Sequence, residues 1–186
     1  MSDIIQYLNT IVQLSAEESE EFSSSLNPLW LKKGEVFLEY GRISSRIAFI
    51  QEGILEMTYS DGSNEKILDF LLPNSFATNY ESFLLNSPSE VQISAIKESS
   101  LLCFEKSSLE KLYNKSVNFQ KIGRILAEKY YLDIIDRIRS QYQTPKIRYD
   151  KLRQTNPEVI QQIPQYKIAS YLDVTPEWLS KLRSKK

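Results

Sequence analysis

The sequence contains no histidine and only one cysteine in 186 residues. Without histidine, Ser-His and Cys-His nucleophile pairs and His-based metal centres cannot form. Because catalysis would then have to rest on carboxylates, lysine or tyrosine, we expect a protein that is not an enzyme and holds no metal. The single Cys103 cannot close an internal disulfide, which predicts a reducing compartment, the cytoplasm.

Long apolar runs are absent as well. No stretch approaches the ~18 apolar residues of a membrane-spanning helix, so we expect no membrane partner. The N-terminal residues MSDIIQYLNTIVQLSAEESEEF carry acidic side chains and no basic region, which argues against a secretory signal. A hydrophobic content of 41% is ordinary for a soluble globular chain, and the length allows one large domain or two small ones.

The net charge of −1 conceals an uneven distribution. Residues 1–120 hold 9 Lys and Arg against 17 Asp and Glu, a balance of −8, whereas residues 121–186 hold 14 against 7, a balance of +7. A basic C-terminal third on an acidic body indicates a polyanionic partner for that third. A solvated charged surface explains the same charges equally well, so charge alone does not decide.

Helical spacing of apolar residues marks the first thirty residues, and short strands follow. Ser15 and Glu18 form a capping-box pattern, and Pro28 ends the helical region. Asp61-Gly62 is the strongest hairpin signal of the chain. Several short strands at this spacing predict an antiparallel barrel or sandwich. The predicted strands are VFLEY (36–40), RIAFIQ (46–51), ILEMTYS (54–60), KILDFLL (66–72), VQISAI (91–96) and LLCFE (101–105).

A long helix is predicted over residues 117–143, which contain no proline and one glycine. Its apolar residues form a stripe that is wider than a surface helix packed on one neighbour requires. One face then packs on the barrel while another meets a second subunit. A single, deeply buried helix is the alternative, and we favour the dimer helix.

The C-terminal residues predict a series of short helices. Thr144-Pro145 and Asn156-Pro157 are helix-start patterns. In QYKIASYLDVTPEWLSKLR one helix ends before Asp173, and Thr175-Pro176 begins the next with Thr175 as its N-cap. This pattern is typical of a helix-turn-helix. Its turn needs a left-handed residue, a conformation that aspartate tolerates less well than glycine.

The second helix of this pair carries polar residues that suit a DNA groove. If Leu179 and Leu182 face inward, Lys181 reaches guanine O6 and N7, and Glu177 accepts from cytosine N4. Trp178 either packs inside the module or contacts a thymine methyl. A helical hairpin that only packs is the alternative. The predicted DNA-binding residues are Thr175, Glu177, Trp178, Ser180, Lys181 and, as phosphate contacts, Arg183, Lys185 and Lys186.

The order of barrel, long helix and helix-turn-helix resembles the Crp/Fnr family of bacterial transcription regulators, which have an N-terminal cyclic-nucleotide-binding β-roll. The tail IPQYKIASYLDVTPEWLSKLR is similar to tails of a branch common in Bacteroidetes. The resemblance covers essentially the whole chain and implies a homodimer that binds double-stranded DNA. Many members continue into a β-hairpin wing, which we do not expect here because the sequence stops at Lys186. The β-roll motifs that fit are LKKGEVFLEYG, RIAFIQEGILEMTY, DGSNEKILDFLLPNSF and ISAIKESSLLCFEKSSLEKL.

The same resemblance places a phosphate cassette at NSFATNYESFLLNSPSEV (74–91). In members that bind cyclic nucleotides, a glycine opens a helix toward the phosphate, a glutamate accepts from the ribose hydroxyl and an arginine pairs with the phosphate. The corresponding residues here are Thr78, Asn79 and Ser89, and Glu90 would repel a phosphate. The basic residues nearest in sequence are Lys66 and Lys97.

We therefore expect that cyclic AMP does not bind to this cassette. Either its polar residues hydrogen-bond a different, uncharged effector, or its apolar residues fill the old pocket as core. The candidate pocket residues are Phe76, Thr78, Asn79, Tyr80, Ser89 and Glu90.

The predicted fold class is α+β. An antiparallel β-roll of the double-stranded β-helix type is expected over residues 1–115, a connecting dimer helix over 116–143 and a helix-turn-helix module without a wing over 144–186. The predicted function is that of a dimeric, DNA-binding transcription regulator of the Crp/Fnr type. No cofactor is expected beyond an unknown small effector. The alternative is a small-molecule-binding or protein-interaction module that keeps the cyclic-nucleotide-binding fold without binding DNA.

Overall fold

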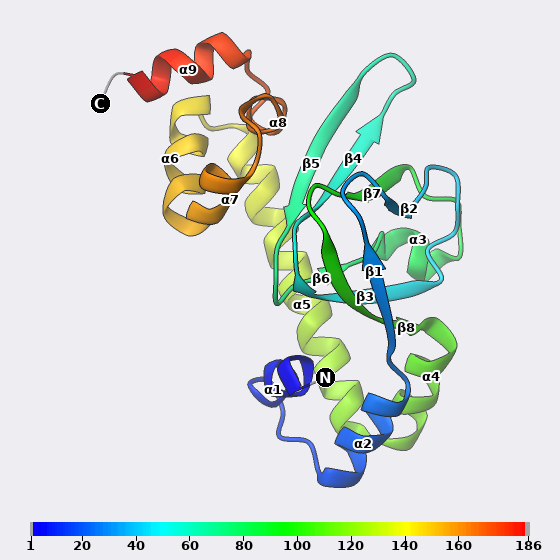
Figure 1. Ribbon diagram of the computed structural model, residues 1–186. Coiled ribbons are helices and arrows are strands. Elements are labelled where there is room, and N and C mark those ends of the chain that lie inside the picture. The colour runs from blue at the N-terminus through cyan, green and yellow to red at the C-terminus, as the bar shows by residue number, and fades with distance from the viewer. Residues whose placement is uncertain (1, 185–186) are drawn as a thin grey trace.

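The computed structural model describes residues 2–184, and two four-stranded antiparallel sheets form its centre (Figure 1). Their strands are β1 (Asn27–Leu31), β2 (Val36–Leu38), β3 (Arg46–Glu52), β4 (Leu55–Ser60), β5 (Glu65–Leu71), β6 (Phe76–Ala77), β7 (Val91–Ala95) and β8 (Ser99–Glu105). The first sheet has the order β1-β8-β3-β6 and the second β2-β7-β4-β5. We call the two sheets together the β-roll.

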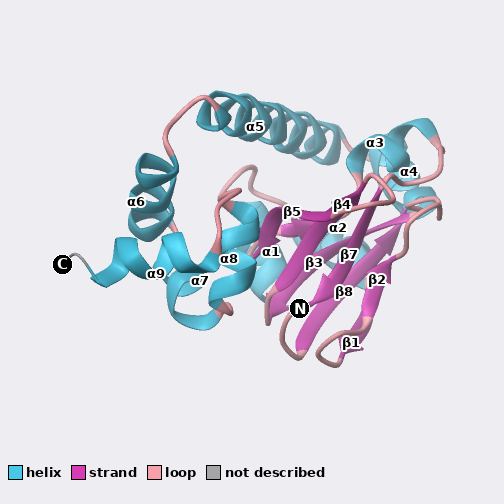
Figure 2. Ribbon diagram, turned by 90° about the horizontal axis from the view of Figure 1, so that it is seen from above, coloured by secondary structure: helices cyan, strands magenta, loops and turns pink. Residues whose placement is uncertain are grey.

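Helices surround the β-roll on several sides (Figures 1 and 2). α1 (Ser2–Asn9) and α2 (Ala16–Ser24) precede it, α3 (Tyr80–Leu85) connects β6 with β7, and α4 (Lys106–Lys115) and the long α5 (Val117–Gln141) follow it. The C-terminal module, as we call the remaining helices, consists of α6 (Pro145–Thr155), α7 (Pro157–Gln162), α8 (Gln165–Tyr171) and α9 (Pro176–Ser184).

Strands β3 and β8 are apolar on both faces because both faces are buried. Ala48 and Cys103 point into the interior between the sheets, whereas Phe49 and Leu102 point outward to a helical layer. This explains why their sequences read as nearly continuous apolar runs rather than as alternating ones. Burial raises the pKa of the Cys103 thiol to about 11, so the thiol stays protonated and behaves as a core residue.

The first sheet is covered by the N-terminal helices and by the first half of α5. Ile4, Leu8 and Phe22 pack with Phe119 and Ile122 of α5 in one buried cluster. The predicted capping box forms: the Ser15 hydroxyl accepts from the Glu18 backbone N–H, and the Glu18 carboxylate accepts from the Ser15 N–H. That carboxylate also accepts from Ser116 and Asn118 at the start of α5, which ties the two helical regions together.

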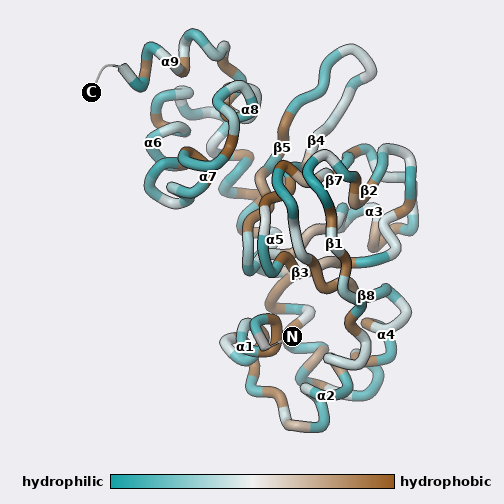
Figure 3. Tube along the Cα trace, in the orientation of Figure 1, coloured by the Kyte–Doolittle hydropathy of each residue, from teal (hydrophilic) through white to brown (hydrophobic). Residues whose placement is uncertain are grey.

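The second sheet is covered by the C-terminal module. Its outward-facing Ile67 and Phe70 pack with Ile168 and Leu172 of the module in one buried cluster. Figure 2 shows the helices of the module beside β5, and Figure 3 shows that the β4–β5 hairpin extends beyond the hydrophobic strands as a hydrophilic arm. The module therefore completes the burial of the β-roll.

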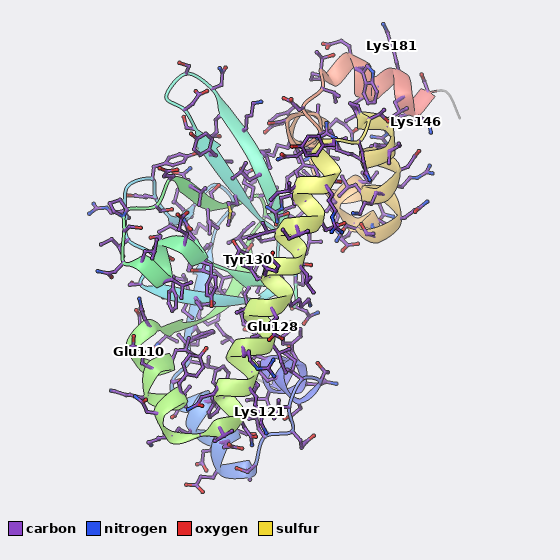
Figure 4. All side chains as sticks on the ribbon, turned by 180° about the vertical axis from the view of Figure 1, so that it is seen from behind. Glu110, Lys121, Glu128, Tyr130, Lys146 and Lys181 are labelled. Carbon is purple, nitrogen blue, oxygen red and sulfur yellow. The ribbon has the colours of Figure 1, made fainter. Side chains whose placement is uncertain are left out.

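α5 runs along the back of the molecule, and its far side is exposed (Figure 4). Tyr131 and Leu132 are 62% and 64% exposed, and with Ala127 and Glu128 they line an apolar concavity. On the inner side Arg137 pairs with Asp69 of β5. No helix among residues 2–184 is long and apolar enough to cross a membrane.

The six predicted strands are confirmed, and two short strands were not predicted. β1 begins one residue before Pro28, which follows α2 as expected but lies in an edge strand, where a missing N–H is tolerated. β6 has only two residues. The Asp61-Gly62 hairpin is confirmed, with Gly62 at φ 88° and the Asp61 carboxylate accepting from the Ser63 and Asn64 backbone N–H groups.

The hydrogen bonds to Glu18 predict an acid-sensitive contact between α2 and α5. The Ser116 hydroxyl first, and then the Ser15 N–H, lower the pKa of Glu18 from 4.5 to about 2. A lowered pKa stabilises the folded state above pH 4.5, and this contribution disappears as pH falls toward 2. We expect Glu18→Gln to lower the melting temperature at neutral pH and to flatten the acid loss of stability, measured by circular dichroism. Glu20→Gln on the same helix is the control, and an unchanged acid profile of Glu18→Gln would contradict the assignment.

Candidate functional site

The connection between α8 and α9 is a Schellman turn with aspartate in the position usually held by glycine. The Asp173 N–H donates to the Ser170 carbonyl over 3.1 Å, and the Val174 N–H donates to the Ala169 carbonyl over 3.0 Å. Asp173 has φ 55°, the left-handed conformation that the sequence pattern requires. Ala169 is buried, so the small side chain lets the two helices approach closely.

Two basic side chains hold this turn from outside. Arg148 of α6 donates to the Leu172 carbonyl, the last residue before the turn. Lys66 of the β4–β5 hairpin lies 3.1 Å from the Asp173 carboxylate. The first contact satisfies a carbonyl at the end of α8, and the second neutralises the charge of the residue in left-handed conformation.

Helix α9 has one buried side and one exposed side. The Thr175 hydroxyl accepts from the Trp178 N–H over 3.2 Å, so Thr175 is the N-cap that the sequence predicted. Leu179 is fully buried, while Ser180 and Lys181 are exposed. Figure 4 shows Lys181 on the side of α9 turned away from the β-roll.

The carboxylate of Glu177 stays charged at the start of α9. Hydrogen bonds from its own backbone N–H and from the Thr175 hydroxyl hold the pKa of Glu177 below its ordinary value. Trp178 is 36% exposed, so its side chain is neither fully packed inside the module nor fully free for a DNA contact. The exposed side of α9 thus offers an acceptor, a hydroxyl and a cation in one short row.

The structure brings most of the predicted DNA-binding residues onto one short helix. Arg183 and Ser184 are exposed in its last turn. Lys185 and Lys186, predicted as phosphate contacts, lie outside the described residues. The residues on α9 or at its cap are Thr175, Glu177, Trp178, Ser180, Lys181 and Arg183.

The predicted cassette is closed by its own hydrogen bonds. Asn79 caps α3 by accepting from the Ser82 N–H, and its amide donates to the Ser89 hydroxyl over 2.8 Å. Ser89 in turn donates to the Val91 carbonyl over 2.7 Å. Asn79 and Ser89 were expected at the positions of the glutamate and the arginine of nucleotide-binding members, and Ser89 is buried.

A second set of hydroxyls continues this network across the cassette. Ser44 donates its N–H to the Ser82 hydroxyl over 2.9 Å, and its own hydroxyl lies 2.9 Å from that of Thr78. Ser44 was not among the predicted residues. No periodic pattern marks it, because it comes from the β2–β3 loop and meets the cassette only through the fold.

The other predicted pocket residues lie in different surroundings. Tyr80 contacts Tyr130 of α5, with ring centroids 5.4 Å apart. Phe76 packs with Phe49 in the aromatic cluster on the outer face of the first sheet, with centroids 5.4 Å apart. Glu90 is exposed. The structure thus brings Thr78, Asn79 and Ser89 together and separates Phe76, Tyr80 and Glu90 from them.

The two lysines nearest the cassette in sequence point toward the C-terminal module. Lys66 pairs with Asp173, and Lys97 donates to the Gln162 side chain over 2.9 Å. Two other cations, Arg42 and Arg46, lie near the hydroxyl network. They line a concavity of about 330 Å³ that reaches the network through Ser44.

The comparisons with known proteins agree with this architecture. Residues 28–116 match the family model of the cyclic nucleotide-binding domain. The c-di-GMP-responsive global regulator CLP of Xanthomonas campestris superimposes with a TM-score of 0.69 at 14% identity, covering 92% of this chain and 91% of that one. The match to Thermus thermophilus catabolite activator protein has a TM-score of 0.58 at 16% identity, covering 96% and 85%.

A further structure, assigned to the Crp/Fnr family of transcriptional regulators and coming from Eubacterium rectale, has a TM-score of 0.68 at 17% identity, covering 92% of this chain and 83% of that one. No curated protein sequence matches the chain significantly. At these identities the structural similarity shows the fold alone. The predicted resemblance is thus confirmed for a cyclic-nucleotide-binding fold whose structural neighbours are Crp/Fnr transcription regulators.

Proposed function

We propose that this protein is a dimeric, DNA-binding transcription regulator of the Crp/Fnr type whose cassette does not bind cyclic AMP. The proposal includes the division into a β-roll domain (1–115), a dimer helix (116–143) and a helix-turn-helix domain (144–186). The observation that carries it is α9, which buries Leu179 completely and exposes Glu177, Ser180 and Lys181 in one row.

α8 and α9 fit the geometry of a helix-turn-helix. A recognition helix enters the major groove with residues of its N-terminal turns, and α9 exposes its polar row over those turns. Lys181 suits guanine O6 and N7, and the ionised Glu177 suits the cytosine N4 amino group. The basic balance of the C-terminal third supports phosphate contacts by Arg183 and by the two C-terminal lysines.

The second half of α5 supports a dimer contact. Tyr131, Ile135, Ile138 and Tyr142 follow one another at intervals of four, three and four residues, the spacing of a two-helix coiled-coil interface. Tyr131 is 62% and Tyr142 is 89% exposed, so these side chains are available to a second copy. A two-fold dimer would place two recognition helices roughly 34 Å apart, in successive major grooves.

The hydrogen bonds of the cassette support the loss of cyclic-nucleotide binding. A cyclic phosphate would have to break the Asn79–Ser89 bond and would find no arginine at the Ser89 position. Tyr80 contacts Tyr130 of α5, with ring centroids 5.4 Å apart. The proposal is compatible with an uncharged effector at the cassette. It is equally compatible with a different molecule in the adjoining concavity that Arg42 and Arg46 line.

The alternative function is a small-molecule-binding or protein-interaction module with the same fold that does not bind DNA. The observation that favours it is the extensive packing of α8 on the β-roll, since a helical cover needs no DNA. Electrophoretic mobility shifts with random genomic fragments at low salt separate the two. Binding supports the regulator, and its absence supports the alternative.

We expect Lys181→Ala to weaken binding to a duplex selected from a random pool by about 1–3 kcal/mol, and to do so mainly at one base pair. The reason is the loss of a direct contact to a base edge. Fluorescence anisotropy with single-base variants of the duplex measures the effect. Lys151→Ala on α6 is the control, and an equal loss on every duplex variant would contradict a base-reading role.

Calorimetric titration with cyclic AMP and with cyclic GMP should show no heat of binding. The physical reason is that the phosphate charge meets the neutral Ser89 in place of an arginine. A dissociation constant in the micromolar range for either nucleotide would show that the cassette is functional.

Ile138→Glu should convert the dimer into a monomer, because it places two like charges opposite each other at the two-fold contact. Ile138 is 46% exposed in the single chain, so the variant should still fold. Sedimentation equilibrium measures the mass. Gln143→Glu adds the same charge at an exposed residue just after α5, outside this a/d seam, and should remain dimeric, whereas a monomeric unaltered protein would contradict the dimer proposal.

A further inference from the structure

We infer that Glu56 of β4 and Lys167 of α8 are positioning residues that fix the C-terminal module on the β-roll, so that α9 is held in one orientation without any effector. The inference rests on the proposed DNA-binding function, since its consequence is a fixed placement of the DNA-reading helix.

The geometry of this ion pair is that of a close, two-pronged contact. The Lys167 ammonium lies 2.6 Å and 2.7 Å from the two carboxylate oxygens of Glu56. The side chains of Glu56 and Lys167 are only 10% and 20% exposed. The Ser94 hydroxyl, 3.5 Å from the Glu56 carboxylate, is its further neighbour on the sheet.

The buried surroundings of the pair require that the two charged side chains stay in contact. Ile168, next to Lys167, is fully buried against the second sheet, and Phe70 contacts Tyr171 with ring centroids 5.2 Å apart. A charge left alone in such a position loses its hydration without gaining a partner. The Glu56 carboxylate on the outer face of β4 is therefore compatible with a docked module only when Lys167 meets it.

Two other polar contacts between module and β-roll are more exposed, and a third, from the Ile67 N–H to the Ser170 hydroxyl, is long at 3.5 Å. The side chains of Lys66 and Asp173 are 58% and 70% exposed, and pairs of this kind contribute little to stability. The bond between Lys97 and Gln162 is likewise at the surface. The Glu56–Lys167 pair is also more buried than the Arg137–Asp69 pair, whose side chains are 35% and 27% exposed, so it is sensitive to how α8 sits on the sheet.

Apolar packing alone does not define the position of α8 on the sheet as sharply as the Glu56–Lys167 ion pair does. Hydrophobic contacts are non-directional, and neighbouring registers of a helix on a sheet bury similar areas. A shift of one residue along α8 turns the attachment point of Lys167 by about 100° around the helix axis and breaks both of its hydrogen bonds to Glu56. The ion pair therefore selects one register, as buried polar groups do in other packed helices.

The selected orientation leaves the DNA-reading surface free. α9 is joined to α8 by the hydrogen-bonded Schellman turn, so fixing α8 also fixes α9. Ser180 and Lys181 remain exposed in this arrangement. The docked state is therefore the binding-competent one, and in a dimer it would set the separation of the two recognition helices.

The test compares a full palindromic duplex with a duplex that carries one half-site, both selected with the unaltered protein. The variants are Lys167→Met, Glu56→Gln and the charge swap Glu56→Lys/Lys167→Glu, with Lys97→Met as the control at the exposed contact with Gln162. Hydrogen exchange of α8 amides, measured by mass spectrometry, reports in parallel whether the module stays folded and docked.

We expect each single variant to lose about tenfold or more in affinity for the palindrome and no more than about threefold for the half-site, because a released module still reads one half-site but no longer holds two at a fixed distance. The charge swap should recover affinity to within about threefold of the unaltered protein, and Lys97→Met should stay within about twofold. Faster exchange in α8 of the single variants, reversed in the swap, completes the expected result.

Four outcomes would overturn the inference while leaving DNA binding intact. These are unchanged palindrome affinity in the single variants, a gain in affinity, an equal loss on both duplexes, or a swap as weak as the single variants. A gain would mean that the docked state is inhibitory, and an equal loss would mean that the pair only stabilises the module. If the unaltered protein binds neither duplex, the proposed function fails and this inference fails with it.

Discussion

The two sheets of the β-roll carry apolar side chains on their outer faces as well as between them, and the rest of the chain is arranged to cover those outer faces. α1, α2 and the first half of α5 cover one sheet through Phe22, Phe119 and Ile122. The C-terminal module covers the other through Ile168 and Leu172. The module is therefore part of the core of the molecule, and its position follows from the burial that the second sheet requires.

Much of this arrangement is visible in the sequence because it depends on local periodicity. Apolar runs such as RIAFIQ and LLCFE, the Asp61-Gly62 turn and the capping box at Ser15 are local, and the structure contains each of them. The left-handed turn residue was likewise predicted from Thr175-Pro176 and the preceding helix. β1 and β6 were not predicted, because an edge strand with a proline and a strand of two residues have no periodic pattern of their own.

The contacts that the sequence did not reveal join residues far apart in the chain. Ser44 meets Ser82 across 38 positions, and Lys167 meets Glu56 across 111. Such pairs combine common residue types at spacings that carry no local signal. The predicted cassette illustrates both sides: the absence of arginine from residues 74–91 is visible in the sequence, whereas the hydrogen bond from Asn79 to Ser89 depends on the fold.

The covering of the second sheet by the last helices of the chain has a consequence for biosynthesis. The ribosome synthesises the strands of the β-roll first, and the helices that bury Ile67 and Phe70 leave the ribosome after them. Until then the nascent chain exposes an apolar sheet face together with the uncompensated Glu56 carboxylate on β4. The Glu56 charge disfavours association of that sheet face with other chains before the helices bury it, as charged residues do on other exposed sheet surfaces.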